Sequence, residues 1–278
     1  SSGKADGNVN PTIVSSKGGV IRIDAKHGFA FPALSLAINE LTNATKKYGI
    51  AAVSVSNSHH FGQAGRHVEC LADSGLIGLM FGNTPKAIPP WGGTQALFGT
   101  NPIAFSAPRK NAPALVIDLS LSKVARGKVM LANQKKERIP EGWAIDEQGN
   151  PTTNAQKALS GAMLPIGDAK GSALALMVEI LAAGLTDSKF GFEASSFLDS
   201  EGDSPDVGQL LIAIDPSFFS GDSFADRMET IVSAILDQPS TRLPGSKRLE
   251  KRKESKEKKI AISKELYDEI TKLTESIL

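Results

Sequence analysis

Ile50-Ala51-Ala52-Val53-Ser54-Val55, followed by Ser56 and then Asn57-Ser58-His59-His60-Phe61-Gly62, separates this chain from the common nucleotide-binding folds. The β-branched residues of the first part predict a strand over Ile50–Val55. A Rossmann site would place Gly-x-Gly-x-x-Gly after such a strand, and a P-loop would place Gly-x-x-x-x-Gly-Lys-Ser/Thr there. Neither pattern occurs anywhere in the sequence. An amide and two histidines occupy the turn instead.

The two histidines, His59 and His60, are the first candidates for chemistry, together with the side chain of Asn57. Loops at strand ends often carry functional side chains, and an imidazole titrates near neutral pH. One of the histidines is therefore a candidate general acid or base. Alternatively, the turn only caps the next helix and its imidazoles bond to the backbone. Adjacent histidines usually point apart, and no Asp or Glu stands at ligand spacing, so we expect no metal site.

The elements on either side of this passage alternate irregularly between strand and helix. The patterns predict helices over Pro32–Tyr48 and Gln63–Ser74, and strands at Gly19–Asp24, Ile77–Gly82, Ile103–Ala107, Ala114–Asp118 and Leu210–Asp215. Several of the strands are joined by short loops that contain Pro and Gly. This order favours a mixed sheet with flanking helices over a regular βαβ array.

The ends of the chain and its later helices are predicted from the same periodicity. Ser1 to Lys17 is predicted to be an irregular surface segment, and residues 186–205 a long polar loop. The helix Lys170–Leu185 is expected to bury Leu174, Met177, Val178, Leu181 and Leu185, and the helix Phe224–Leu236 to bury Met228, Ile231, Val232 and Ile235. Pro239–Gly245 is predicted to be a linker, and a last helix is expected from Ser263.

Composition narrows the class of protein. The chain has 278 residues, a formal net charge of +1 and 41% hydrophobic residues, so it has enough sequence for a large core and no general attraction to nucleic acid. Cys70 is its single cysteine, which excludes an internal disulfide framework. No apolar stretch approaches the ~20 residues that cross a bilayer. The basic run Lys247–Lys259 contains glutamates but no aromatic residue, which is typical of a solvated segment. We therefore expect a soluble, cytoplasmic protein that binds neither membrane nor nucleic acid.

Three further segments carry candidate binding residues. Thr84 and the pair Thr100-Asn101 lie in turns rich in Pro and Gly, which permit close backbone approach to a ligand or merely punctuate loops. Asp118-Leu119-Ser120-Leu121-Ser122-Lys123 follows a predicted strand, and its polar groups suit ribose and phosphate oxygens or an ordinary helix cap. Asp168-Ala169-Lys170 opens a helix, where unpaired N–H groups favour anions or are simply capped.

Taken together, these segments resemble the malate/L-lactate/sulfolactate dehydrogenase family, a group of NAD(P)-dependent oxidoreductases without a Rossmann fold. The resemblance runs in order through Asp24–Leu34, Asn57–Gly65, Pro89–Gly93, Gly99–Pro102, Asp118–Lys128, Ile139–Thr153, Leu164–Leu185, Val207–Pro216 and Arg242–Gly245. It implies an α+β fold with a mixed, largely antiparallel sheet. It also implies a homodimer in which the partner subunit completes each active site.

The resemblance also assigns roles to residues. His60 takes the position of a histidine beside the substrate that gives or accepts a proton. The residues implied to contact the cofactor are Thr84, Asp118, Leu119, Ser120, Ser122, Lys123, Ala169, Lys170, Gly245, Ser246 and Lys247. Asn57, Thr100, Asn101 and Asp168 are implied to face the substrate. Asp168 departs from the aromatic residue or histidine that many relatives carry before Lys-Gly, which leaves room for substrates besides malate and lactate.

The implied reaction is hydride transfer between NAD(P)H and C2 of a small 2-oxo or 2-hydroxy acid, or of a cyclic imine carboxylate. Lys123 and Arg126 could meet a 2′-phosphate, which favours NADPH over NADH. The resemblance implies an NAD(P)-binding sheet domain over residues 19–219 and a helical, dimerising part formed by 1–18 and 220–278. The family has a further N-terminal segment with a Ser-His-Gly motif, which the sequence from Ser1 does not contain. A truncated or degenerate homologue that binds nucleotide or dimerises without catalysis is the alternative.

Overall fold

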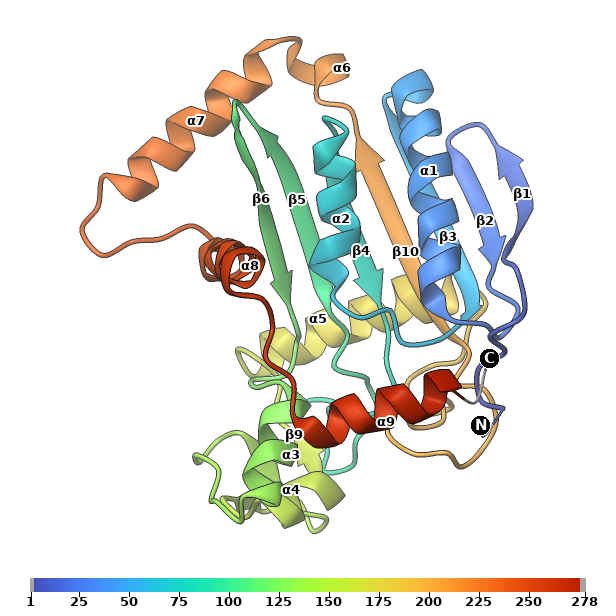
Figure 1. Ribbon diagram of the computed structural model, residues 1–278, viewed down its shortest axis with the longest axis vertical. Coiled ribbons are helices and arrows are strands. Elements are labelled where there is room, and N and C mark those ends of the chain that lie inside the picture. The colour runs from blue at the N-terminus through green and yellow to red at the C-terminus, as the bar shows by residue number, and fades with distance from the viewer. Residues whose placement is uncertain (1–2, 276–278) are drawn as a thin grey trace.

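The computed structural model describes residues 3–275 and is built around one seven-stranded sheet. Its strands are β1 (Thr12–Lys17), β2 (Val20–Asp24), β3 (Ile50–Ser58), β4 (Ile77–Gly82), β5 (Ile103–Arg109), β6 (Ala112–Leu119) and β10 (Val207–Ile214). They lie in the order β1-β2-β3-β10-β4-β5-β6 (Figure 1). Within the described residues β2 and β3 run parallel and every other neighbouring pair is antiparallel. The predicted mixed, largely antiparallel sheet is confirmed.

Helices α1 (Ala30–Tyr48) and α2 (Ala64–Asp73) cover one face of this sheet (Figure 1). Leu34 and Leu41 of α1 are fully buried with Val53 and Val55 of β3. Apolar residues at helical spacing on one element therefore meet alternate residues of a strand on the other. The helix α1 ends at Gly49, whose φ of +81° a residue with a side chain rarely adopts. Both predicted helices are confirmed.

The opposite face is covered by α5 (Ala169–Glu179), which continues into a π-helical turn at Ile180–Gly184. The prediction of its buried face is wrong for Leu174, Met177 and Leu185, which are 40%, 37% and 62% exposed. Small residues face inward instead: Gly171, Ala175, Ala182 and Ala183 are buried together with Val178. A Cβ at Gly171 would lie 1.7 Å from the carbonyl oxygen of Ile166, so the close approach of the chain requires glycine. Small side chains let this helix pack tightly, and its large apolar ones point outward.

A small subdomain lies between β6 and α5 in the sequence. It contains α3 (Arg126–Gln134), α4 (Ala155–Ser160) and a three-stranded sheet of β7 (Ala144–Ile145), β8 (Pro151–Thr152) and β9 (Ala162–Met163). Its own core includes Val129, Ile139 and Met163. The sequence patterns predicted none of these elements, because the strands have two residues each and the helices are short.

The C-terminal part consists of α6 (Ser217–Ser220), α7 (Ser223–Leu236), α8 (Ser246–Lys258) and α9 (Lys264–Glu275). Val232 of α7 is buried as predicted, but Ile231 is 56% exposed, so its predicted burial is wrong. Met228 and Ile235 are half-buried. Leu266 and Ile270 lie on an exposed side of α9. No helix within residues 3–275 combines the length and the apolar character needed to cross a membrane.

Two boundaries differ from the sequence predictions. Thr12–Lys17 is the strand β1 rather than an irregular segment, and it pairs antiparallel with β2 at the edge of the sheet. Its residues are mostly exposed, so it lacks the apolar alternation of a half-buried strand. Ser1 and Ser2 lie outside the described residues. The strand β3 continues to Ser58, which places Asn57 inside the strand with a φ of +50°.

Candidate active site

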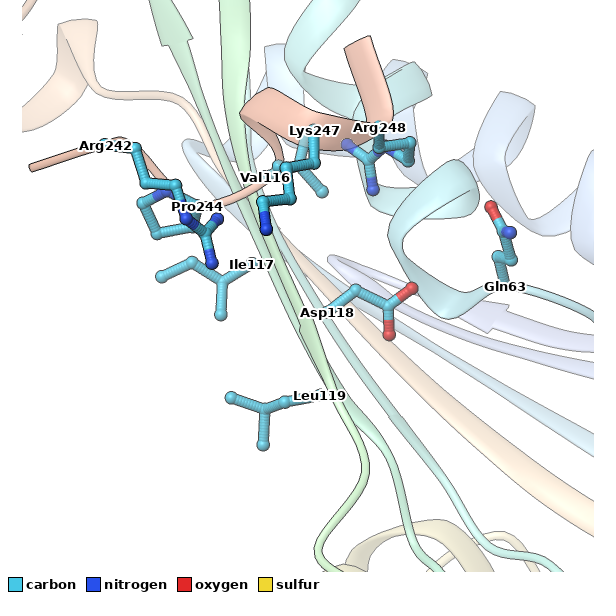
Figure 2. Close-up of a pocket in the computed structure, with 10 residues that line it drawn as sticks. Gln63, Val116, Ile117, Asp118, Leu119, Arg242, Pro244, Lys247 and Arg248 are labelled. Carbon is cyan, nitrogen blue, oxygen red and sulfur yellow. The ribbon is translucent and has the colours of Figure 1, made fainter. Parts of the chain in front are cut away.

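A pocket of about 590 Å³ lies along β6, the edge strand opposite β1. It is lined by Gln63, Val116, Ile117, Asp118, Leu119, Arg242, Pro244, Gly245, Lys247 and Arg248. Figure 2 shows Asp118 on the side of β6 that faces Gln63 and Arg248, whereas Ile117 and Leu119 leave the strand on the other side. This is the alternation expected of a strand. The volume of the pocket lies in the range of small-molecule sites, about 300–1,000 Å³.

Three elements meet at Gly65, the second residue of α2. The backbone N–H of Gly65 donates to Oδ2 of Asp118 over 2.8 Å, so the N-terminus of α2 fixes this carboxylate. A Cβ at Gly65 would lie 2.9 Å from both that oxygen and Nη1 of Arg248. Only glycine therefore lets α2, β6 and α8 come this close. The second oxygen of Asp118 is available to accept from a ligand hydroxyl.

The helix α8 is held against α2 by the buried carboxylate of Glu69, which is 6% exposed. Arg252 reaches both carboxylate oxygens at 2.8 Å, Arg66 lies 3.1 Å away and Arg248 3.7 Å. Burial alone raises the pKa of Glu69, but the hydrogen bonds from Arg252 and Arg66 outweigh it and the net pKa is lowered. The basic run Lys247–Lys259 was predicted to be a solvated segment; it is helical as far as Lys258, and its Arg248 and Arg252 dock on Glu69 of α2.

Replacing Glu69 by glutamine is expected to weaken dinucleotide binding about tenfold while leaving the protein folded. The neutral amide cannot balance three arginines, so α8 and the adjoining Gly245–Arg248 segment lose their position beside Asp118. Fluorescence titration with NADPH measures the change. Glu254→Gln, an exposed change on α8, is the matched control. If Glu69→Gln and the unchanged protein bind NADPH with equal affinity, the ion pairs of Glu69 with the arginines do not shape the pocket.

Thr84 and Thr100 lie side by side, with their hydroxyl oxygens 3.2 Å apart. The neighbouring Asn101 is fully buried, and its amide donates to Oε1 of Glu179 and to the carbonyl oxygen of Ala175, each over 2.9 Å. Thr84 and Thr100 therefore remain candidates for ligand contact. The amide nitrogen of Asn101 fastens the turn to α5, and the contact of Asn101 with substrate stays a prediction.

The hydroxyls of Ser120 and Ser122 are 2.7 Å apart and bond to the backbone of Thr100 and Val124. Lys123 is exposed, and neither it nor Arg126 lines the pocket. Arg126 donates to the carbonyl oxygen of Leu159, and burial lowers its pKa. The predicted contact of these two cations with a 2′-phosphate therefore has no support in the pocket geometry.

The start of α5 is exposed at Asp168, Ala169 and Lys170. A ligand that binds the N-terminus of the helix needs this access. Asp168 has a φ of +57°, and its carbonyl oxygen accepts from the N–H of Ser172. The structure thus leaves the first turn of α5 open to a ligand. These residues do not line the pocket beside β6.

His60 lies just after β3 as an exposed residue whose ring contacts two phenyl rings. Its ring stacks on Phe61 with centroids 6.1 Å apart and meets Phe197 edge-on at 5.3 Å. The N–H of Gly62 donates to its Nδ1 over 3.2 Å, so the proton of the neutral imidazole resides on Nε2. Partial burial lowers the pKa of His60. Asn57 lies near the end of β3, where its Nδ2 donates to Oδ1 of Asp24 over 2.9 Å.

The structure brings together four of the predicted cofactor residues, Asp118, Leu119, Gly245 and Lys247, in one pocket. Ser246 adjoins them, and its hydroxyl bonds to the carbonyl oxygen of Leu243. Gln63, Arg242 and Arg248 line the same pocket and were not predicted. Arg242 opens the Arg-Leu-Pro-Gly segment and Arg248 follows Lys247, so both stand within segments that the sequence analysis singled out.

The donor set of this pocket suits a dinucleotide. Arg242, Lys247 and Arg248 supply cations for phosphate, and Asp118 supplies an acceptor for a ribose hydroxyl. Gly245 has a φ of +82°, and a Cβ there would lie 3.1 Å from the carbonyl oxygen of Val116, so the backbone can approach a ligand closely. Among residues 3–275 no three His, Cys, Asp or Glu side chains are grouped to hold a metal ion.

Comparison with known proteins finds relatives that are named as a dehydrogenase and as a reductase. The chain is 53% identical over 241 residues to a (2R)-3-sulfolactate dehydrogenase (NADP(+)) of Chromohalobacter salexigens, covering 87% of this chain and 72% of the relative. It is 39% identical over 276 residues to a Δ1-pyrroline-2-carboxylate/Δ1-piperideine-2-carboxylate reductase of Pseudomonas aeruginosa, covering 98% and 82%.

Solved structures agree with these relatives. The Δ1-piperideine-2-carboxylate reductase of Pseudomonas syringae superimposes with a TM-score of 0.92 at 39% identity, over 98% of this chain and 82% of that one. The sulfolactate dehydrogenase of Methanocaldococcus jannaschii gives 0.88 at 32% identity, over 99% and 80%. The sequence profile of the malate/L-lactate dehydrogenase family matches residues 1–271. Fold, pocket and relatives together show that the chain belongs to the malate/L-lactate dehydrogenase family.

Proposed function

We propose that the protein is an NAD(P)H-dependent oxidoreductase that transfers hydride to or from C2 of a small 2-oxo or 2-hydroxy acid or of a cyclic imine carboxylate. The observation that carries the proposal is the pocket along β6, where Asp118 faces Arg248 beside Lys247 and Arg242. Relatives named as an NADP(+)-dependent sulfolactate dehydrogenase and as imine carboxylate reductases support both substrate classes.

When bound, the dinucleotide would supply hydride in reduction or accept it in oxidation, and the residues of this chain would bind it, orient it and exchange a proton with the substrate. The cations of the pocket hold phosphate, Asp118 accepts from ribose, and Leu119 offers an apolar contact. Because Nδ1 of His60 accepts from Gly62, its Nε2 gives or takes the proton of the substrate oxygen or nitrogen. Thr84, Ser120, Ser122, Ala169 and Lys170 are further proposed cofactor contacts; Asn57, Thr100 and Asp168 are proposed to face the substrate.

The phosphate-binding cations give the first test of this proposal. Replacing Lys247 by alanine is expected to lower the affinity for NADPH about tenfold or more, the loss of one charge-assisted contact. NADH affinity falls less if Lys247 meets the 2′-phosphate, and equally if it meets the pyrophosphate. Fluorescence titrations with both nucleotides measure this. Lys251→Ala, an exposed change on α8 outside the pocket, should bind like the unchanged protein. No saturable binding of either nucleotide to the unchanged protein would refute the proposed function.

Turnover separates the proposal from the alternative of a nucleotide-binding homologue without catalysis. A panel of 2-hydroxy acids, sulfolactate and cyclic imine carboxylates, assayed in both directions, gives the substrate class. Saturable NADPH binding without turnover of any of them would favour the alternative.

The proposed assembly is a homodimer. Exposed apolar side chains support it: Leu174 and Met177 of α5, and Leu185 just after the π-helical turn, are 37% to 62% exposed in the single chain. The division of the chain at residues 19 and 219 and a cytoplasmic location also remain predictions. Light scattering gives the mass of the particle, and a monomer at micromolar concentration would contradict the dimer.

A further inference from the structure

Phe197 is placed against both histidines of the candidate site by a loop far away in sequence. Its ring lies 5.3 Å from that of His60, edge-on, and 5.2 Å from that of His59, tilted by 35°. Phe197 belongs to residues 186–205, which connect the π-helical turn to β10 and which we call the Phe197 loop. An aromatic ring in this position shields the imidazoles from water on one side.

The Phe197 loop is fastened at its base. The N–H of Gly191 donates to Oε2 of Glu179 over 3.0 Å, and Nζ of Lys189 donates to the carbonyl oxygen of Ser204 over 2.8 Å. Lys189 also pairs with Asp206 at 3.0 Å. These contacts fix where the loop leaves and rejoins the fold. They do not reach the segment around Phe197.

That segment is held by Lys4, which is only 5% exposed. Nζ of Lys4 donates to the carbonyl oxygen of Ser196 over 2.6 Å and to Oδ1 of Asp199 over 3.2 Å, on both sides of Phe197. A buried ammonium group is costly unless its donors are satisfied, so these bonds hold the loop and the lysine together. Figure 1 shows the N-terminal segment beside the chain that leads into β10.

From this geometry we propose that Phe197 is a positioning residue for His60, forming one wall of the space where substrate meets the imidazole, and that Lys4 holds Phe197 in place. The assignment of His60 as proton donor rests on the proposed function, whereas the wall itself does not. The groups that face the histidines are Phe29, Phe61 and Phe197 by contact and Lys4 and Asp206 by charge. Burial is the cause that lowers the pKa of His60, which agrees with such a wall.

The wall is tested by NMR titration of the four histidines without any substrate. Phe197→Ala is expected to move the midpoint of His60 upward, toward the ordinary imidazole value, and to remove a ring-current shift from its signals. Phe197→Tyr retains the ring and should restore both. Phe192→Ala is the matched control, because Phe192 lies in the same loop and stacks on Phe190 rather than on a histidine. If Phe197→Ala does not fold, the loss of the ring-current shift in Phe197→Leu decides the same question.

The role of Lys4 is tested in the same way. Lys4→Met is expected to raise the midpoint of His60, and Lys4→Arg to preserve it; Lys17→Met, an exposed change in β1, is the control. His60 is the diagnostic signal, because the charge of Lys4 acts directly on His59. In turnover, Phe197→Ala should lower kcat/KM about 10- to 100-fold.

The results separate this inference from the proposed function. Unchanged His60 signals in folded Phe197→Ala overturn the wall, and unchanged His60 signals in Lys4→Met overturn the role of Lys4. Shifted signals in a protein without turnover support the wall and count against the proposed function alone.

Discussion

Replacing His60 by alanine is expected to lower kcat about 10²- to 10⁴-fold, the usual contribution of a positioned acid–base group. The side chain stands where Nε2 can exchange a proton, because Nδ1 accepts from the N–H of Gly62. Affinity for NADPH should change little, since His60 does not line the pocket beside β6. Steady-state rates and nucleotide titration on the same preparation separate the two effects.

The proton transfer by His60 also predicts how the rate of each direction of the reaction depends on pH. Partial burial lowers the pKa of His60 from the ordinary value of about 6.5. Reduction needs the protonated imidazole, so its rate falls as pH rises through this lowered pKa. Oxidation needs the neutral imidazole, so its rate rises as pH increases through the same lowered pKa.

The matched control for His60 is His27→Asn, a change at an exposed histidine that bonds to Asp206 instead. It should leave kcat near that of the unchanged protein. His60→Ala with undiminished kcat would remove His60 from the mechanism. If the pH–rate profile of His60→Ala still shows the transition assigned to the lowered pKa, that transition belongs to another group.

The long elements of the fold follow from the sequence, because each buries one side of a regular pattern. The helix α1 and the strands β3 and β10 have apolar residues at the spacing that their geometry demands, and all three were predicted. Periodicity mispredicted burial where small residues are buried and large apolar residues are exposed. In α5 the small residues Gly171 and Ala175 are buried, whereas Leu174 is 40% exposed. The edge strand β1 is mostly exposed, and its Ile13 and Val14 follow one another instead of alternating with polar residues, so no half-buried pattern marks it.

The candidate site was predicted in pieces, whereas its assembly depends on contacts distant in sequence. Segments such as Asp118–Lys128 and Gly245–Lys247 could be singled out, but nothing local shows that Gly65 and Glu69 of α2 bring them together. The same holds for Phe197, which reaches His60 only because Lys4 and Glu179 anchor its loop. Charged groups that hold such contacts have no sequence signature of their own.

Replacing Glu179 by alanine is expected to cost about 3–5 kcal/mol of unfolding free energy. Its carboxylate is 3% exposed and accepts from the N–H of Gly99 and the amide of Asn101, both at 2.9 Å, and from the N–H of Gly191 at 3.0 Å. Alanine leaves these three donors buried without an acceptor, at about 1–3 kcal/mol each before relaxation. For a domain with a total stability of about 5–15 kcal/mol, that loss is large.

The measurement is a denaturant or thermal unfolding curve, in which Glu179→Ala should lower Tm on the order of 10 °C. Glu147→Ala, an exposed glutamate in the small subdomain, is the matched control and should change Tm little. Glu179→Gln should fall between the two, because its amide oxygen can accept while its NH₂ group faces N–H donors. The two segments that Glu179 joins are the turn of Thr100 and the base of the Phe197 loop. Activity at a temperature where Glu179→Gln is still folded should therefore fall as well. An unchanged Tm in Glu179→Ala would mean that water or a rearranged chain satisfies these donors, and that the buried carboxylate does not tie the site to α5.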